Sequence, residues 1–117
     1  FHAADHPRMR STYARIRERL GAGPGLLYRY EDSLRVREGA FWICSFWAVE
    51  HLVRGGGTLD EAREMFTAAC SYANDVGLMA EELDPATGDA LGNFPQAYTH
   101  VGLVSAALSL GRAEPQP

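Results

Sequence analysis

Hydrophobic positions along the chain fall into four helical stretches that differ in how much of their surface is apolar. In residues 6–20 the apolar side chains recur at steps of three and four residues and form one narrow stripe. Arginines fill most of the other positions, so this stretch is expected to be an outer, solvent-facing helix. Asp5 is its expected N-cap, Pro7 fits the first turn, and the glycine-rich residues 21–25 end it.

A second outer helix is predicted after Thr58. Thr58 and Glu61 have the spacing of a capping box, in which each residue bonds the backbone N–H of the other. From Leu59 the apolar positions form one face of a helix that ends at about residues 72–74. Charged residues cover the opposite face, which again indicates an outer position.

The stretches 40–54 and 94–110 are apolar nearly all the way round, which predicts helices buried on several sides. Residues 55–57, all glycine, end the first. Asn93 is the expected N-cap of the second, with Pro95 in its first turn. The large aromatic residues of the first inner helix are interpreted as core rather than as a binding platform: Trp42, Phe46 and Trp47.

The order outer, inner, outer, inner predicts an all-α fold built of two helical hairpins. It favours an arc of a helical toroid or solenoid over a closed four-helix bundle, whose helices would all show similar half-apolar faces. Two outer helices cannot cover the inner helices on every side. The inner helices are therefore expected to pack against the remainder of a toroid in a parent chain, or against a self-association partner.

Composition narrows the classes of function. The 117 residues are 46% hydrophobic and 22% charged, which is typical of one globular domain, and the net charge is −4. No basic face suggests nucleic acid as a partner, and no apolar run is long enough to span a membrane. No signal peptide is visible, so a cytoplasmic location is expected, although a chain that starts at Phe1 indicates a missing upstream part. Cys44 and Cys70 are expected to be reduced, buried thiols, with a disulfide between them left open.

Unusual polar residues gather in two segments, 26–39 and 76–92, which enter the two inner helices and are expected to meet at one end of the fold. The four histidines are scattered without metal-ligand spacing, and no cofactor-binding fingerprint is present, so neither a metal nor a cofactor is expected. His100 is interpreted as a hydrogen-bonded core histidine. Carboxylates and aromatic residues remain, and this combination suits glycoside hydrolysis, although composition alone does not single it out.

Three stretches of the chain form a familiar set: LLYRYEDS, EGAFWICSFWAVEHL and YANDVGLMAEELDPATGDALGNFPQAYTHVGLVSAAL. Together they resemble the C-terminal part of glycoside hydrolase family 15, which includes glucoamylases, glucodextranases and bacterial trehalases. The resemblance covers about residues 5–110 and is most specific over residues 80–107. It implies an (α/α)6 toroid of outer and inner helices, an inverting hydrolysis of α-glucosidic bonds, and a C-terminal fragment of that catalytic domain in residues 1–117. Residues 111–117 are expected to form a frayed tail.

The resemblance also implies roles for individual residues. The family's general base lies in an Ala-Glu-Gln or Ala-Glu-Glu element, which matches residues 80–82, so Glu81 is the implied base and Glu82 a supporting residue. Adjacent side chains in an extended segment point to opposite sides, so Glu81 and Glu82 are not expected to form an acid–base pair. The family's general acid lies far upstream near a Trp-Glu element, and nothing in this chain matches it.

Three weaker correspondences concern substrate binding. Arg29 matches an arginine that contacts substrate in fungal relatives, with an ion pair to a loop carboxylate as the alternative. If the loops meet, Arg29 is also a candidate cation beside Glu81. Tyr98 takes a position that often holds a sugar-contacting tryptophan, with a core tyrosine as the alternative. Glu38 lies where relatives line the pocket.

The leading hypothesis is therefore that the chain is part of an inverting α-glucoside hydrolase, which acts on a glucan end or on trehalose. The isolated chain is expected to be inactive because the general acid is absent. The alternative is a truncated, non-catalytic relative that binds carbohydrate or protein through its exposed inner helices. A purely structural helical repeat is a third option, and the irregular segments 26–39 and 76–92 speak against it.

Overall fold

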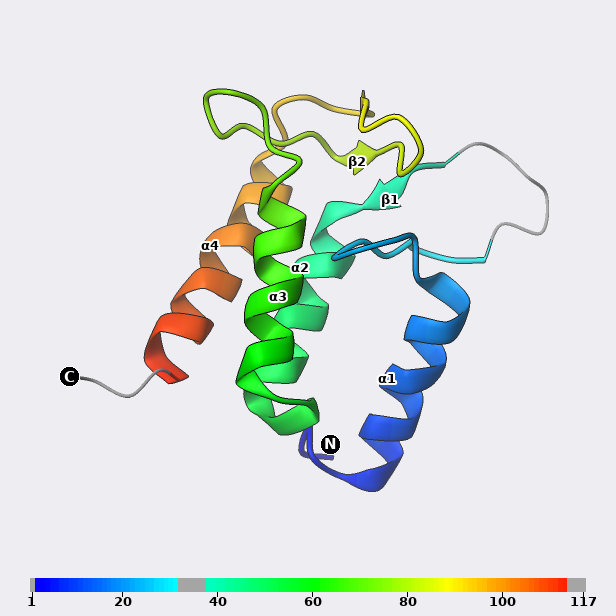
Figure 1. Ribbon diagram of the computed structural model, residues 1–117, viewed down its shortest axis with the longest axis vertical. Helices are drawn as coiled ribbons and strands as arrows, with labels where there is room; N and C mark the ends of the chain where they lie inside the picture. The colour runs from blue at the N-terminus through cyan, green and yellow to red at the C-terminus, as the bar shows by residue number, and fades with distance from the viewer. Residues whose placement is uncertain (1, 32–37, 114–117) are drawn as a thin grey trace.

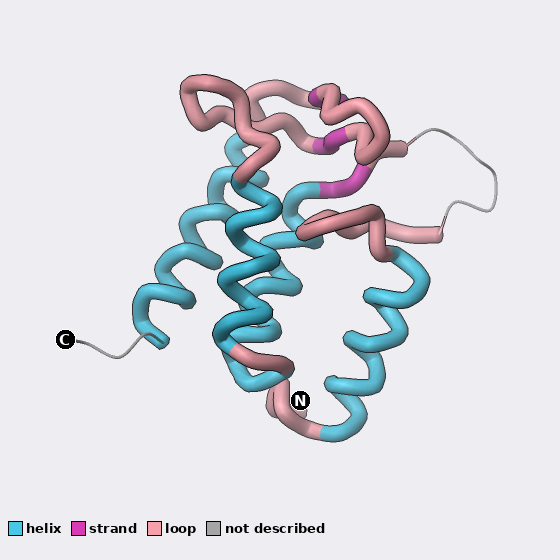
Figure 2. The backbone as a smooth tube through the Cα atoms, viewed as in Figure 1, coloured by secondary structure: helices cyan, strands magenta, loops and turns pink. Residues whose placement is uncertain are grey.

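The computed structural model describes residues 2–31 and 38–113, and it is mostly helical with one small antiparallel sheet (Figures 1 and 2). The elements in chain order are α1 (Pro7–Leu20), β1 (Ala40–Phe41), α2 (Trp42–His51), the π-helical turn η1 (Leu52–Gly56), α3 (Leu59–Cys70), β2 (Glu82–Leu83), β3 (Ala90–Leu91) and α4 (Ala97–Ala113). The architecture confirms the predicted all-α arc of a helical toroid and adds a sheet that the sequence did not reveal.

The alternation of outer and inner helices is confirmed by burial. No residue of α1 is buried, and α3 buries only one face, at Ala62, Met65 and Ala69. In contrast, α2 buries six of its ten residues. It packs against both α3 and α4, with α1 and α4 on either side of the α2–α3 pair in Figure 1. The core therefore forms around α2, the most apolar helix.

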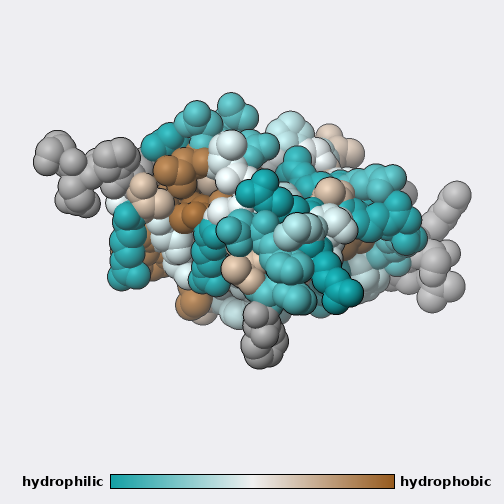
Figure 3. Space-filling view, turned by 90° about the horizontal axis from the view of Figure 1, so that it is seen from below, coloured by the Kyte–Doolittle hydropathy of each residue, from teal (hydrophilic) through white to brown (hydrophobic). Residues whose placement is uncertain are grey.

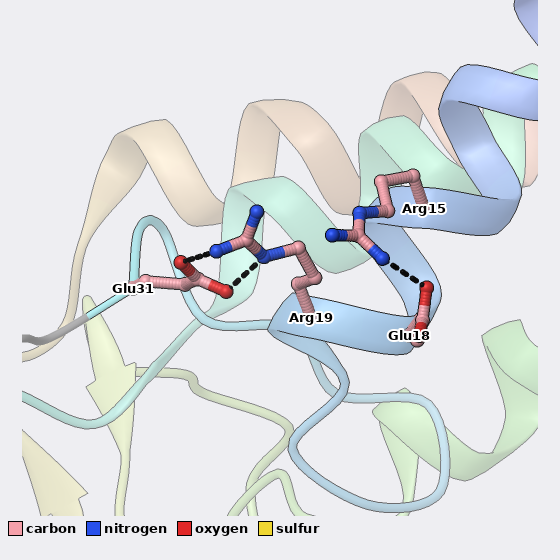
Figure 4. Close-up of polar contacts among 4 residues, drawn as sticks. All are labelled: Arg15, Glu18, Arg19 and Glu31. Atoms are coloured by element: carbon pink, nitrogen blue, oxygen red, sulfur yellow. Dashed lines mark hydrogen bonds and ion pairs between the residues drawn. The ribbon is translucent and has the colours of Figure 1, made fainter.

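The outer helix α1 begins one residue later than predicted. Its N-cap is His6 rather than Asp5, because the His6 Nδ1 atom accepts a hydrogen bond from the Arg8 backbone N–H at 3.2 Å. Figure 4 shows two ion pairs along this helix, Arg15 with Glu18 and Arg19 with Glu31. The second pair ties the end of α1 to the extended segment that enters α2.

The two predicted boundaries between α2 and α3 are largely confirmed. The first inner helix continues through the π-helical turn to Gly56, and Gly55 has a φ of 100°, a conformation that favours glycine. Both hydrogen bonds of the predicted capping box are present between Thr58 and Glu61. The helix α3 ends at Cys70, before the predicted end. After it, the Asn74 side chain accepts hydrogen bonds from backbone N–H groups of the following turn.

Three two-residue strands connect the entry loops of the inner helices. β1 pairs with β2 in the register Ala40–Leu83 and Phe41–Glu82, and β2 pairs with β3. Strands this short carry no period in the sequence, which is why they were not predicted. The backbones approach closely here, since a Cβ atom on Gly39 would lie 2.6 Å from the Leu83 carbonyl oxygen.

The last helix, α4, begins at Ala97 rather than near Phe94, so Pro95 is not in its first turn and Asn93 is not its N-cap. Residues 92–96 instead form a turn whose backbone bonds the segment before β2, as the Gln96 N–H donates to the Met79 carbonyl at 3.0 Å. The helix continues to Ala113, three residues past the expected end at Leu110, and residues 114–117 lie outside the described part of the chain.

One side of the molecule presents apolar side chains to solvent. α4 exposes Val101, Val104 and Leu108, each by more than half of its surface. In Figure 3, hydrophobic side chains gather toward the α4 side, whereas the α1 side is mostly hydrophilic. Trp47, interpreted above as core, is 52% exposed, so that interpretation is wrong for the described residues. Trp42 and Phe46 are buried as predicted.

The two cysteines, Cys44 and Cys70, are free in the structure and half-buried rather than fully buried. Burial raises the pKa of both the Cys44 and the Cys70 thiol. Among the described residues, no helix has the length and apolar character needed to cross a membrane.

Candidate functional site

The entry segments of the two inner helices meet at one end of the molecule, as predicted. Figure 2 shows the segment after α1, the three short strands and the turn before α4 gathered at the same end. Two hydrogen bonds join these segments across the chain. The Phe41 N–H donates to the Leu27 carbonyl at 2.8 Å, and the Trp42 N–H donates to the Glu81 carbonyl at 3.3 Å. The candidate residues therefore lie on backbone that is fixed by long-range pairing.

The segment before Glu81 is held from the first turns of α4. The Thr99 hydroxyl, which is fully buried, donates to the Ala80 carbonyl at 3.0 Å. The Met79 N–H donates to His100 Nε2 at 3.4 Å, while His100 Nδ1 lies 2.7 Å from the Gln96 carbonyl oxygen. Since Nε2 accepts the hydrogen bond from the Met79 N–H, the tautomer that fits both contacts has its proton on Nδ1, which donates a hydrogen bond to the Gln96 carbonyl oxygen. His100 is hydrogen-bonded within the fold, which confirms its structural interpretation.

Glu81 lies just before β2, and its carboxylate is bound by a single residue. Its Oε2 atom accepts hydrogen bonds from the Asn93 backbone N–H at 3.2 Å and from Asn93 Nδ2 at 2.9 Å. In return, the Glu81 N–H donates to the Asn93 carbonyl at 2.9 Å. No hydrogen-bond partner of Oε1 is present among residues 2–31 and 38–113, so the two oxygens of this half-buried carboxylate differ in their hydrogen bonding. Such a carboxylate can accept a proton from a bound water.

The Glu82 carboxylate binds a different segment of the chain from that bound by Glu81. Its Oε2 atom accepts a hydrogen bond from the Gly39 N–H at 2.9 Å, across the pair of strands β1 and β2. Burial raises the pKa of the Glu82 carboxyl, and the nearby Glu38 and Glu81 carboxylates raise it further. The Gly39 hydrogen bond and the Arg29 guanidinium act against this rise. The carboxylate of Glu82 therefore connects two strands, a different task from that of Glu81.

Arg29 and Glu38 form an ion pair across the two ends of the segment that enters α2. The Arg29 guanidinium also lies over the Phe41 ring, 4.7 Å from its centroid, which is the geometry of a cation–π contact. The ion pair with a loop carboxylate, named above as the alternative for Arg29, is thus present. Arg29, the candidate cation beside Glu81, is paired with Glu38 instead.

Tyr98 is 51% exposed at the start of α4, so it is not a core tyrosine within the described residues. Its ring meets the exposed Trp47 ring edge to face, with centroids 6.2 Å apart. Two half-exposed aromatic rings from the two inner helices therefore lie side by side at the surface.

Sequence reasoning placed Asn93 among the polar residues near the inner-helix entries but missed its contact with Glu81, and it missed Thr99 altogether. Asn93 was expected to cap a helix, but the dipeptide Gly92-Asn93 is equally a turn signal, and the turn prevails here. Thr99 had no signal, because its partner is a carbonyl 19 residues away. No group of three or more potential metal ligands occurs in the part of the chain that the structure describes.

Comparison with known proteins gives one family match and several similar proteins. Residues 56–108 match the family described as glycosyl hydrolases family 15. The chain is 43% identical to a trehalase of Mycolicibacterium smegmatis over 97% of its own length and 18% of the relative's. It is 42% identical to a trehalase of Mycobacterium tuberculosis over 94% of its length and 17% of the relative's.

A more distant relative is a trehalase of Thermoplasma volcanium, 37% identical over 97% of this chain and 18% of that protein. The chain thus spans less than a fifth of the length of the curated relatives it matches. The comparison with solved structures gave no significant match. Residues 56–108 are thus similar to glycosyl hydrolases family 15, and the chain is similar along nearly its whole length to trehalases.

Proposed function

We propose that this segment contributes the general base, Glu81, to an inverting hydrolase of α-glucosidic bonds, with trehalose as the favoured substrate. The observation that carries the proposal is the Glu81 carboxylate, which has Oε2 fixed by Asn93 and Oε1 left without a partner in the described residues. The favoured substrate rests on the relatives' name, since those that match the chain over most of its length are trehalases. A glucan end is the second substrate class of the family that the sequence resembles.

In the proposed reaction, Glu81 removes a proton from a water molecule while an acid protonates the glycosidic oxygen on the other face of the sugar. The bond from the anomeric carbon to that oxygen breaks as the bond from water forms, so the configuration inverts. The two carboxyl groups of an inverting pair lie about 6.5–9.5 Å apart, which leaves room for the water. The acid comes from residues outside this chain, so we expect the 117 residues alone to be inactive.

The other candidate residues are proposed to shape the pocket. Tyr98, beside Trp47, offers an aromatic surface to a sugar ring. Arg29 and Glu38 are proposed as polar contacts to sugar hydroxyl groups, with each holding the other in place between turnovers. Glu82 supports the site by tying β2 to Gly39. No cofactor takes part in this chemistry.

The adjacent glutamates provide a matched test of the base. In the full-length protein, Glu81→Gln keeps the size of the side chain and removes its basicity, so we expect kcat on trehalose to fall by about 10²–10⁴-fold. Glu82→Gln keeps an oxygen that accepts from the Gly39 N–H, so kcat should change by only a few-fold. Maltose and short dextrans, assayed in parallel, distinguish the two substrate classes.

If turnover survives in Glu81→Gln but is lost in Glu82→Gln, the proposal names the wrong glutamate and Glu82 is the base. A full-length protein that hydrolyses none of these sugars would favour the alternative of a non-catalytic, carbohydrate-binding or protein-binding module. A cytoplasmic location stays a prediction, which fractionation of the source cells would test.

A further inference from the structure

We infer that Asn93 is the positioning residue of the candidate site, and that it selects which oxygen of Glu81 acts as the base. This inference rests on the proposed function, because it assigns a task to a neighbour of the proposed base. Asn93 is not a ligand of the substrate in this inference. It acts only through the Glu81 carboxylate.

The first argument is the way in which the two residues are joined. Asn93 donates two hydrogen bonds to the same oxygen, one from the backbone and one from the side chain, at 3.2 and 2.9 Å. The Glu81 N–H donates back to the Asn93 carbonyl at 2.9 Å, which fixes the two backbones relative to each other. A carboxylate held on one oxygen by two donors cannot rotate to exchange its oxygens without breaking both bonds. Oε2 is therefore committed, and Oε1 is the oxygen that meets water.

The second argument is the approach of the backbone beside this contact. Gly92 has a φ of 70°, and a Cβ atom there would lie 2.8 Å from Glu81 Oε2. A side chain at this position would occupy the space of the committed oxygen. The turn of residues 92–93 thus lies directly against Oε2, the oxygen that Asn93 binds.

The third argument is that the turn itself is firmly placed. The Gln96 N–H donates to the Met79 carbonyl at 3.0 Å, and the buried Thr99 hydroxyl donates to the Ala80 carbonyl. Three successive residues before β2 are consequently bonded to the segment that carries Asn93. These bonds hold the Glu81 carboxylate in a fixed position. A fixed position matters for a general base, since displacing a catalytic group by about 1 Å lowers the rate by up to about 100-fold.

The test compares Asn93→Ala, Asn93→Asp and Asn93→Gln with the wild type in the full-length protein, using trehalose. We expect kcat to fall about 10- to 100-fold in Asn93→Ala, with KM changed by less than about twofold, since the substrate is not contacted. Asn93→Asp places a second negative charge beside Glu81, so the acidic limb of the pH profile of kcat/KM should move to higher pH. Asn93→Gln keeps an amide donor and should retain more activity than Asn93→Ala.

Asn74 provides the matched control, because it is a loop asparagine whose side chain bonds only its own turn, accepting from Val76 and Leu78 N–H groups. Asn74→Ala should lower the melting temperature without moving the pH profile. If the profiles of Asn93→Ala and Asn93→Asp superimpose on the wild type, or if only KM changes, the inference is wrong. Asn93→Asp is nearly isosteric, so it decides the matter even if Asn93→Ala fails to fold.

Glu81→Gln, measured beside these variants, separates the two proposals. If Glu81→Gln keeps wild-type turnover, the proposed base is wrong, and the task assigned to Asn93 is wrong with it. If Glu81→Gln is inactive while the Asn93 variants keep the wild-type kcat and pH profile, the base stands and only the positioning inference fails.

Discussion

Gly92 is the residue at which backbone conformation and candidate chemistry meet most directly. Its φ of 70° lies in the left-handed region that residues with a side chain rarely adopt. Because glycine has no side chain, the Glu81 carboxylate fits beside this residue. A Cβ atom on Gly92 would lie 2.8 Å from the Glu81 Oε2 atom. Gly88, in the preceding turn, has nearly the same φ, 79°, but no atom within 4 Å of a built Cβ. A substitution at Gly88 therefore tests conformational strain alone, whereas a substitution at Gly92 tests strain together with the contact to the Glu81 carboxylate.

We predict that Gly92→Ala and Gly88→Ala in the full-length protein each lower the free energy of unfolding by about 1 kcal/mol through strain. Only Gly92→Ala should also lower kcat, by about tenfold or more, because it displaces the Glu81 carboxylate. Denaturant titration and trehalose kinetics on both variants provide the check. Equal kcat values in the two variants would show that the close approach to Glu81 is unimportant.

For single residues, the sequence predicts on which side of the segment the Glu81 and Glu82 side chains lie, but it does not predict their hydrogen-bond partners. The opposite orientation of Glu81 and Glu82 follows from the period of two along an extended chain. The partners Asn93 and Gly39 do not, because they are 12 and 43 residues away in sequence. Which donor reaches which carboxylate depends on how the loops are brought together.

The end of α2 shows how one element is stabilised by two others. His51, its last residue, packs against the Tyr13 ring of α1 in a tilted arrangement, with ring centroids 4.7 Å apart. Gly56, in the π-helical turn, passes so close that a Cβ atom there would lie 2.1 Å from His51 Nε2. That nitrogen is buried and has no hydrogen-bond partner among the described residues. Burial lowers the pKa of His51, and the Arg10 guanidinium lowers it further.

We predict that this contact loses stability in acid. A histidine whose pKa is lower in the folded state binds its proton more weakly there, so stability falls as the pH drops below about 6.5, the unfolded value, towards the folded value. His51→Phe keeps a ring against Tyr13 and cannot be protonated. The urea midpoint of the variant should therefore fall less between pH 7.5 and pH 5.5 than that of the wild type. Parallel pH dependence of the two midpoints would contradict the prediction.

Elements with local determinants were predicted well. The capping box at Thr58 depends on residues three apart, and both of its hydrogen bonds are present. The start of α4 was predicted three residues too early, because Asn93 and Gln96 bond the segment before β2 rather than a helix. A cap is predictable only when no distant partner competes for the capping residue.

On the scale of the whole molecule, burial is one-sided. The helix α4 buries Thr99, Gly102, Ala106 and Leu110 against its neighbours and exposes a second apolar stripe. Gly102 permits the close approach to α2, since a Cβ atom there would lie 2.4 Å from the Ile43 Cδ1 atom. An apolar stripe of this length on a helix that is already packed on one side is typical of a layer that continues. We propose that the remainder of the toroid covers it in the parent protein, and a second copy of the chain is the alternative.

We predict that Val104→Asp in the full-length protein lowers the free energy of unfolding by at least about 2 kcal/mol, because it places a charge in a covered apolar layer. Thr67→Asp, at an exposed position of the outer helix α3, is the control and should change stability by less than about 0.5 kcal/mol. Thermal unfolding of both variants provides the measurement. If Val104→Asp is as harmless as the control, the face of α4 is open in the parent protein.

The amino-acid pattern by itself determined the helices, their alternation between outer and inner positions, and the convergence of the polar segments at one end. These properties follow from local periodicity and from capping residues close in sequence. The tertiary structure decided which groups meet there: Asn93 with Glu81, Gly39 with Glu82, and Glu38 with Arg29. The physical reason is that hydrogen bonds and ion pairs form only when the two groups are about 3 Å apart. For residues far apart in sequence, that distance is set by the packing of the backbone.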